Sequence, residues 1–217
     1  MSELRYRKQI IETALAMNSL GVNRGTSGNV STRWKDGFLI TPSGRRYEET
    51  KPADIVFVDA GGRAHGKWAP SSEWRFHHDI YRNRNDAHAI VHTHSSFATT
   101  LACLRKNVPA FHYMVAVAGG RDIRCAPYAT FGTQKLSDHA LKALAGRKAC
   151  LLANHGMIAT GPSLQKALAL AVEVEALCEQ YWRALQVGKP KILPPEEMNV
   201  VLRKFRSYGN PEQDGKK

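Results

Sequence analysis

Features that mark several common protein classes are missing from this sequence of 217 residues. Its four cysteines lie far apart and form no CxxC pair, which favours reduced thiols over a disulfide framework. No apolar run is long enough to cross a membrane, and the charged N-terminal segment has no signal-peptide core. We therefore expect a cytoplasmic protein with no membrane partner.

The sequence also lacks a long block of basic residues, although its formal net charge is +12. Lysine and arginine form only short clusters, such as Arg45-Arg46, Arg105-Lys106 and Arg203-Lys204. No aromatic face is interleaved with them, as a nucleic-acid-binding surface would require. Neither a P-loop nor a GxGxxG fingerprint occurs. We expect a solvated basic surface that attracts phosphate, and no nucleic-acid partner.

Nothing in the composition divides the chain, which predicts a single domain over residues 1–217. Hydrophobic residues make up 43% of the sequence, which is sufficient for a sizeable core. Helical and extended patterns alternate, with some adjacent strands early in the chain, so we expect a mixed α/β domain. The polar C-terminal segment 209–217 is expected to be a flexible tail.

Hydrophobic periodicity and turn residues predict the individual elements. The segment 113–118 is apolar but shows no preference for one type of element. Helices are expected over residues 4–20, 69–80, 96–105, 134–145, 163–187 and 194–208, and strands over 30–33, 37–41, 55–58, 87–92 and 149–153.

Two histidines stand two residues apart in the string VHTH, where His92 and His94 follow an apolar run. Residues i and i+2 of a strand project from the same face, roughly 6.5–7 Å apart along the chain. Both imidazoles could therefore bind one metal ion. By spacing alone, two surface or hydrogen-bonded histidines are the commoner explanation.

A third histidine strengthens the metal interpretation. His155 follows the predicted strand 149–153, and Gly156 after it permits a sharp turn or a close approach. Three histidines at strand ends could hold Zn²⁺ or a similar divalent ion and leave one position for a substrate. The neighbours His77 and His78 point to two faces of a predicted helix and are expected to be structural or exposed.

One acid and three turn segments complete the candidate chemistry. Glu73 is the natural acid/base candidate, although its local sequence is more typical of a helix N-terminal acid. The pairs Gly28-Asn29, Ser43-Gly44 and Ser71-Ser72 offer backbone amides that suit a phosphate. Each pair by itself is equally typical of an ordinary turn.

Seven strings and the C-terminal VVLRKFRSYG occur in an order that resembles the class II aldolase/adducin-like family, most closely its L-fuculose-1-phosphate aldolases. The likeness spans residues 5–209, and the strings are GTSGNVSTR, LITPSG, PSSEWRFH, AIVHTH, AFHYMVAVAGG, CAPYATFGT and ANHGMIA. The resemblance implies a three-layer α/β/α fold around a mixed, largely antiparallel sheet. It also implies a homotetramer with active sites at subunit interfaces and one Zn²⁺ per subunit.

Residue roles follow from the same resemblance. It implies that Glu73 is the acid/base and an additional metal ligand when substrate is absent, and that Tyr113 reaches a neighbouring subunit's site. The other implied roles are metal ligand for His92, His94 and His155; phosphate binding for Gly28, Asn29, Ser43, Gly44, Ser71 and Ser72; and the aldehyde pocket for Phe131 and Tyr208.

The implied reaction cleaves a ketose 1-phosphate, such as L-fuculose 1-phosphate, to dihydroxyacetone phosphate and lactaldehyde. Tyr113 would remove the C4 hydroxyl proton, and Glu73 would then protonate carbon. Residues beside the implied ligands, namely Thr93, Ser95-Ser96 and Asn154, depart from the pattern of the fuculose enzymes. The alternative is therefore a 5-methylthioribulose or 5-deoxyribulose 1-phosphate aldolase.

Three further alternatives receive less support. Sugar-phosphate 4-epimerases of this family typically have Asp in place of Glu73, together with a HADYF-like segment that is missing here. The related dehydratases usually carry a cysteine near the phosphate loops, and this sequence has none there. A non-catalytic adducin-like scaffold would have lost its ligands, whereas all three histidines and Glu73 are present.

Overall fold

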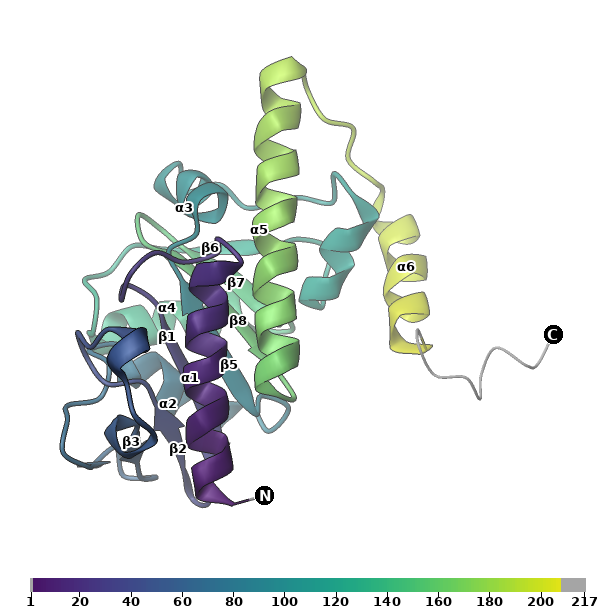
Figure 1. The fold of residues 1–217 in the computed structure, drawn as a ribbon. Coiled ribbons are helices and arrows are strands. Elements are labelled where there is room, and N and C mark those ends of the chain that lie inside the picture. Colours follow the sequence, from purple (N-terminus) through teal and green to yellow (C-terminus); the bar gives the residue numbers. More distant parts are fainter. Residues whose placement is uncertain (1, 208–217) are drawn as a thin grey trace.

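The structure is a computed structural model that describes residues 2–207 (Figure 1). Tyr208 and the predicted flexible segment 209–217 lie outside these residues. The helices are α1 (Glu3–Ser19), α2 (Trp74–Asn83), α3 (Ser96–Cys103), α4 (Gln134–Ala143), α5 (Leu164–Val187) and α6 (Pro195–Ser207), with 3-10 turns η1 (Tyr47–Glu49), η2 (Pro52–Asp54) and η3 (Tyr113–Ala118). The strands are β1 (Asn29–Trp34), β2 (Gly37–Ile40), β3 (Val56–Val58), β4 (Ala64–His65), β5 (Ala89–Thr93), β6 (Arg124–Ala126), β7 (Ala149–Leu152) and β8 (Gly156–Gly161).

The described strands form one eight-stranded sheet in the order β4-β3-β2-β1-β5-β8-β7-β6. Neighbouring strands are antiparallel throughout, except that β6 and β7 run parallel. Helix α4 connects this parallel pair, as a crossover must. The prediction of a mixed, largely antiparallel sheet in a single α/β domain is confirmed.

Helices cover both faces of the sheet, which confirms the three-layer α/β/α architecture. Helices α1, α3 and α5 share one apolar core with the sheet, and α2 and α4 share the other. In Figure 1, α1 and α5 lie side by side on the near face, while α6 stands apart from the sheet beside η3. Strand β5 serves both cores, because Val91 faces the first and Ile90 the second.

Three strands were not predicted from sequence, namely β4, β6 and β8. Strand β8 begins and ends with glycine, a residue that strands usually disfavour. Gly156 is needed because a Cβ at this position would collide with the backbone oxygen of Thr93 on β5. The expected close approach at Gly156 is therefore present, at the end of the antiparallel ladder that joins β5 and β8. The untyped segment 113–118 forms η3.

The expected serine cap of α2 is wrong. The helix begins at Trp74, with Glu73 in the N-cap position, and neither serine before it caps the helix. The hydroxyl of Ser71 instead accepts from the Glu73 backbone N–H at 3.3 Å. The Glu73 carboxylate makes no capping hydrogen bond either, so it is free to turn into the molecule.

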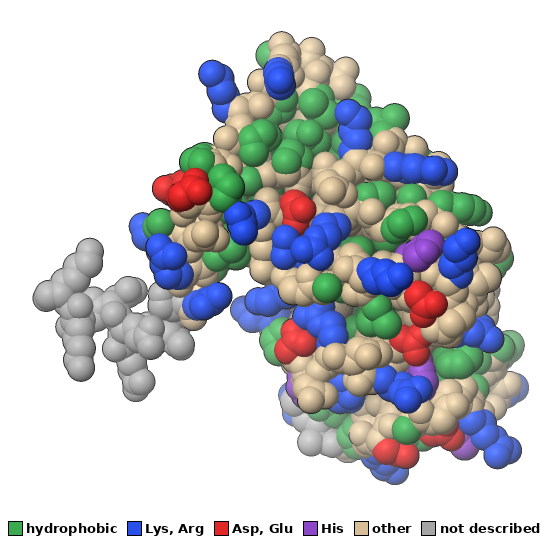
Figure 2. All heavy atoms as spheres, turned by 180° about the vertical axis from the view of Figure 1, so that it is seen from behind, with side chains coloured by type: hydrophobic (Ala, Val, Ile, Leu, Met, Phe, Trp, Pro, Cys, Tyr) green, Lys and Arg blue, Asp and Glu red, His purple; other side chains and the backbone are tan. Residues whose placement is uncertain are grey.

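Surface features agree with the composition. Among the described residues, no helix combines the length and apolar character needed to cross a bilayer. On the face shown in Figure 2, lysine and arginine side chains are spread among acidic, polar and hydrophobic groups and do not gather in one patch.

Candidate metal and active site

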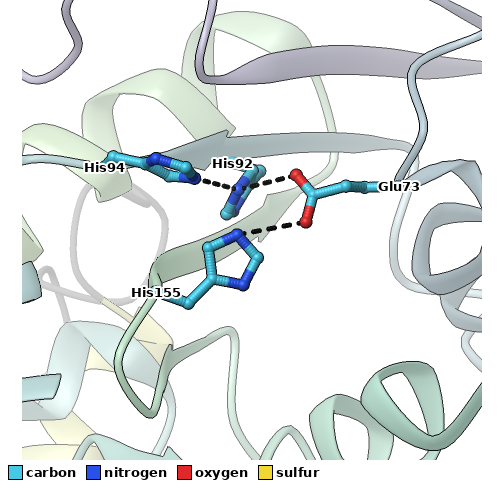
Figure 3. Close-up of side chains that lie close together, drawn as sticks. All are labelled: Glu73, His92, His94 and His155. Atoms are coloured by element: carbon cyan, nitrogen blue, oxygen red, sulfur yellow. Dashed lines mark hydrogen bonds and ion pairs between the residues drawn. The ribbon is translucent and has the colours of Figure 1, made fainter. Parts of the chain in front are cut away.

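Four side chains from three parts of the chain converge at one end of β5. Because Ile90 faces the α2/α4 core, His92 two residues later faces it too, and its ring packs edge-on against Phe76 at 5.4 Å. His94 lies just beyond the strand end, and His155 lies in the turn between β7 and β8. Glu73 approaches from the start of α2, and Figure 3 shows all four side chains pointing toward one another.

The ligand atoms are close enough to share one ion. The Nε2 atom of His92 lies 3.0 Å from Glu73 Oε2 and 3.0 Å from His94 Nε2. His155 Nε2 lies 3.1 Å from Glu73 Oε1. One donor atom from each residue lies within 4.8 Å of all the others. Ligands at about 2.0–2.2 Å from a tetrahedral ion are spaced by roughly 3.3–3.6 Å, so this donor set fits a divalent metal.

Hydrogen bonding of His92 gives an independent reason to expect a cation. Its Nδ1 donates to the Met157 carbonyl of β8 at 2.8 Å, which leaves the Nε2 lone pair facing the carboxylate of Glu73. Glu73 Oε1 is buried and makes no well-aligned hydrogen bond, although His155 lies beside it. Acceptor atoms that face one another in a buried site repel unless a cation lies between them.

Electrostatics at this site favour an ionised carboxylate with a positive charge beside it. Burial disfavours the charge on Glu73, but His92 and His155 outweigh burial and hold the pKa of its carboxyl well below the usual value. Burial lowers the pKa of His94 to about 4, helped by His92 and His155. Burial would lower the pKa of His92 as well, but the Glu73 carboxylate outweighs burial and raises the pKa of His92 above its usual value. A divalent cation can replace the proton that this negative charge attracts.

Contacts behind His94 fix the loop that carries it. The next residue, Ser95, donates from its hydroxyl to the carboxylate of Glu175 on α5 at 2.7 Å. The same carboxylate accepts from the backbone N–H groups of Phe97 and Ala98, both at 2.8 Å. Glu175 belongs to α5, but its carboxylate lies at the N-terminus of α3. A negative charge is favourable at this end of a helix.

The turn that carries His155 has its own support. Asn154 adopts a left-handed conformation with φ of 54°, which asparagine tolerates better than most residues. Its backbone N–H donates to Ala102 of α3 at 3.1 Å, and its side-chain oxygen accepts from Arg105 at 3.2 Å. The turn is therefore tied to the end of α3 and not only to the sheet.

A cavity of about 350 Å³ opens beside these ligands. Tyr128 and Phe131 line it and are 52% and 64% exposed, so two aromatic rings stand at its mouth. Its other lining residues are Thr26, Ser27, Ser72, Glu73, His94, Ala129, Asn154 and His155. The predicted aldehyde residue Phe131 is therefore at the site, whereas Tyr208 lies outside the described residues.

Two of the predicted phosphate segments, Ser43-Gly44 and Ser71-Ser72, lie on loops that are tied together, and Ser72 lines this cavity. Ser43 N–H donates to the Ala69 carbonyl and Ser71 N–H donates to the Thr41 carbonyl, each at 3.0 Å. Within residues 2–207, the amides of Gly44 and Ser72 make no hydrogen bond. These two unpaired amides are therefore available as donors to an anion.

Asn29 and Tyr113 are placed differently from one another. Asn29 is buried next to Gly28, and its side-chain amide donates to Glu73 Oε2 at 3.0 Å while its oxygen contacts His77. Only the second amide hydrogen is left for an anion.

Tyr113 is 51% exposed on η3 and lines a separate hollow with residues of α6. Within one chain the structure does not bring Tyr113 to the metal ligands.

Sequence reasoning missed several residues around the site. His77 and Tyr81 are buried partners of Asn29 and Ser31, and Glu175 supports the loop of His94. The spacing of Glu73, His77 and Tyr81 at i, i+4 and i+8 could have revealed the first group, because these positions share one helix face. No local signal indicates Glu175, which lies 80 residues beyond Ser95.

Comparison with known proteins agrees with this geometry. Residues 8–182 match the class II aldolase and adducin N-terminal domain. The chain is 58% identical over 212 residues to the 5-methylthioribulose-1-phosphate/5-deoxyribulose-1-phosphate aldolase of Rhodospirillum rubrum, covering 98% of this chain and 96% of that protein. It is 50% identical over 210 residues to the L-fuculose phosphate aldolase of Escherichia coli K12, covering 96% and 98%.

A solved structure supports the same assignment. The structure of an L-fuculose 1-phosphate aldolase superposes with a TM-score of 0.91 at 42% sequence identity, over 93% of this chain and 96% of that one. The family expected from the sequence motifs is therefore confirmed. The chain belongs to the class II aldolase and adducin family, and it is one of the family's aldolases, which are lyases.

Proposed function

We propose that this protein is a zinc-dependent aldolase that cleaves a ketose 1-phosphate to dihydroxyacetone phosphate and a short aldehyde. The observation that carries the proposal is the convergence of Glu73 with three imidazoles beside a cavity of about 350 Å³. The paired loops of Ser43-Gly44 and Ser71-Ser72, with Gly28 and Asn29, would hold the phosphate.

Each group has a defined task in this reaction. The Zn²⁺ held by His92, His94 and His155 would bind substrate oxygens and stabilise the negative charge that develops on them. Glu73, ionised at neutral pH, would receive the proton that Tyr113 removes from the C4 hydroxyl and deliver it to C3 after the C3–C4 bond has broken, so that one proton moves from oxygen to carbon and none is lost. Such a mechanism needs no lysine, because no Schiff base forms.

We place 5-methylthioribulose 1-phosphate and 5-deoxyribulose 1-phosphate first as substrates. The relative named for these two sugars is 58% identical, compared with 50% for the fuculose phosphate aldolase. Tyr128 and Phe131 at the cavity mouth suit an apolar methyl or methylthio end group. L-Fuculose 1-phosphate stays as the second candidate, because the fuculose phosphate aldolase of Escherichia coli K12 aligns over 96% of this chain and a solved fuculose 1-phosphate aldolase has the same fold.

We further propose a homotetramer in the cytoplasm in which Tyr113 completes a neighbouring subunit's site and removes the C4 hydroxyl proton. Its exposed position away from its own subunit's ligands supports this arrangement. Mixing inactive Tyr113→Phe and Glu73→Gln subunits should restore sites that carry both native residues. If the mixture regains no activity after subunit exchange, Tyr113 acts within its own chain or not at all.

The test of the proposed function is a cleavage assay with zinc-loaded protein. We would compare the three ketose 1-phosphates and detect dihydroxyacetone phosphate with a coupled dehydrogenase. Release that a chelator abolishes and zinc restores would support the proposal, and kcat/KM would rank the aldehyde end groups. If zinc is bound but no substrate is cleaved, the aldolase proposal for these sugars is wrong.

A further inference from the structure

A chain of buried hydrogen bonds runs from Glu73 into the core between the sheet and α2. Asn29 Nδ2 lies 3.0 Å from Glu73 Oε2, and Asn29 Oδ1 lies 2.5 Å from His77 Nε2. His77 Nδ1 lies 2.6 Å from the Ser31 hydroxyl, which lies 2.8 Å from the Tyr81 hydroxyl. All five side chains are buried, so these contacts are not shared with solvent.

The charge of Glu73 decides the direction of every bond in this chain. A carboxylate only accepts, so the Asn29 amide must present its N–H₂ to Oε2 and its oxygen to His77. His77 must then carry its proton on Nε2 and accept at Nδ1 from the Ser31 hydroxyl. Ser31 in turn accepts from Tyr81. The donors therefore all point toward Glu73, and bonds aligned in this way strengthen one another.

The protonation states of the two ring side chains agree with this direction. Burial lowers the pKa of His77 to about 3, so the imidazole is neutral and has one donor and one acceptor nitrogen. Burial raises the pKa of Tyr81, so its hydroxyl keeps the proton that it donates. With the opposite tautomer of His77, the Asn29 oxygen would face the Glu73 carboxylate, and two acceptors would repel each other.

We propose that His77 is a positioning residue that holds the Asn29 amide as a donor to Glu73 Oε2 and thereby leaves Oε1 as the oxygen that transfers the proton. Oε1 is buried and has no well-aligned hydrogen bond, unlike Oε2. Ser31 and Tyr81 complete the support from behind. The inference rests on the proposed function, because it assigns Glu73 as the acid/base.

Paired substitutions at one position separate this role from simple packing. Glutamine places an amide nitrogen near the position of Nε2, whereas asparagine reaches only the position of Nδ1. His77→Asn should lower kcat between about tenfold and a hundredfold with little change in KM, because Glu73 is misplaced but substrate binding is not. His77→Gln should recover most of this loss. Equal kcat for the two variants would overturn the proposal.

Ile80→Val is the matched control for stability. Ile80 is fully buried on the same helix and in the same core but makes no side-chain hydrogen bond. This variant should lose some thermal stability, as His77→Asn does, and yet keep wild-type kcat. If Ile80→Val lowers kcat as much as His77→Asn, the effect comes from core packing and the proposal is wrong.

A measurement on the unaltered protein needs neither substrate nor variant activity. Solid-state NMR of zinc-loaded protein labelled with ¹⁵N-histidine reports which ring nitrogen of each histidine carries hydrogen. The resonance that disappears in His77→Gln identifies His77, and it should show a neutral ring protonated at Nε2. A ring protonated at Nδ1 would overturn the proposal. This result also stands if no ketose 1-phosphate is cleaved, so a failed function and a failed inference are distinguishable.

Discussion

Two halves of the metal site are held by different kinds of structure. His92 and Glu73 form the inner half, where His92 lies within β5 and is bonded to β8, and Glu73 is bonded to Asn29 at the start of β1. His94 and His155 form the outer half, beyond the ends of β5 and β7. Their loops are secured by Glu175 and by Asn154 with Arg105.

Because of this difference, substitutions in the two halves should affect the stability of the fold to different extents. The inner half is part of the backbone ladder and of the α2/α4 core, so disturbing it disturbs the fold as well. The outer half depends on polar contacts at the surface of the sheet, which can be removed while the cores remain intact. We therefore expect inner substitutions to affect stability and chemistry together, and outer substitutions to affect mainly the metal.

The largest expected effect is that of Glu73→Gln on turnover. Glutamine keeps the size of the side chain but cannot accept and return a proton, so kcat should fall by about 10²–10⁴. Most of the metal should stay bound through the three histidines. Zinc content and kcat measured on the same preparation check this, and near-normal turnover would remove Glu73 from the mechanism.

His92→Ala and His94→Ala test the comparison directly. Both should weaken zinc binding by at least about a hundredfold in chelator competition, since each removes a metal ligand. His92→Ala should also lower the melting temperature of the metal-free protein, because the Met157 carbonyl loses its partner at a cost of about 1–3 kcal/mol. His94→Ala should melt near the wild type.

The exposed His65, on β4 at the far edge of the sheet, provides the control. His65→Ala should change neither zinc affinity nor turnover. Equal destabilisation by His92→Ala and His94→Ala would show that the outer half is as much a part of the folded core as the inner half.

Glu175→Gln should have a smaller effect, confined to the outer half. Loss of the charge that accepts from Ser95, Phe97 and Ala98 loosens the loop of His94, so zinc affinity should fall about tenfold. Glu179→Gln is the matched control one turn along α5, where Glu179 pairs with Arg183 at the surface. If the two variants bind zinc equally well, Glu175 has no part in positioning His94.

Labelling of the four cysteines should have the smallest effect on activity, and it measures how accessible each thiol is in the folded protein. Cys103 at the end of α3 is exposed and should react with iodoacetamide first. Burial raises the pKa of Cys125 to about 11, so it should react more slowly. Cys150 and Cys178 are buried and should react only on unfolding, as mass spectrometry of labelled peptides would reveal. Early labelling of Cys150 would mean that the inner sheet opens readily.

Most helices and the strands β1, β2, β3, β5 and β7 could be predicted because apolar periodicity is a local property of the chain. The proximity of His92 and His94 was also predictable from the alternation of a strand, although β5 ends at Thr93 and His94 lies in the loop beyond it. The order of motifs around Glu73, His92, His94 and His155 was sufficient to indicate the family and its ligand set. These features need no knowledge of what packs against what.

Only the tertiary structure decided how these side chains are held and which partners the Glu73 carboxylate has. Locally, Glu73 is a helix N-terminal acid, but its partner Asn29 lies 44 residues away and meets it because α2 packs on the face of the sheet that contains β1 and β5. Glu175 reaches Ser95 across 80 residues because α5 packs on α3. Such contacts depend on strand order and helix packing, which no local pattern encodes, so the sequence by itself indicates the ligands and the fold supplies their support.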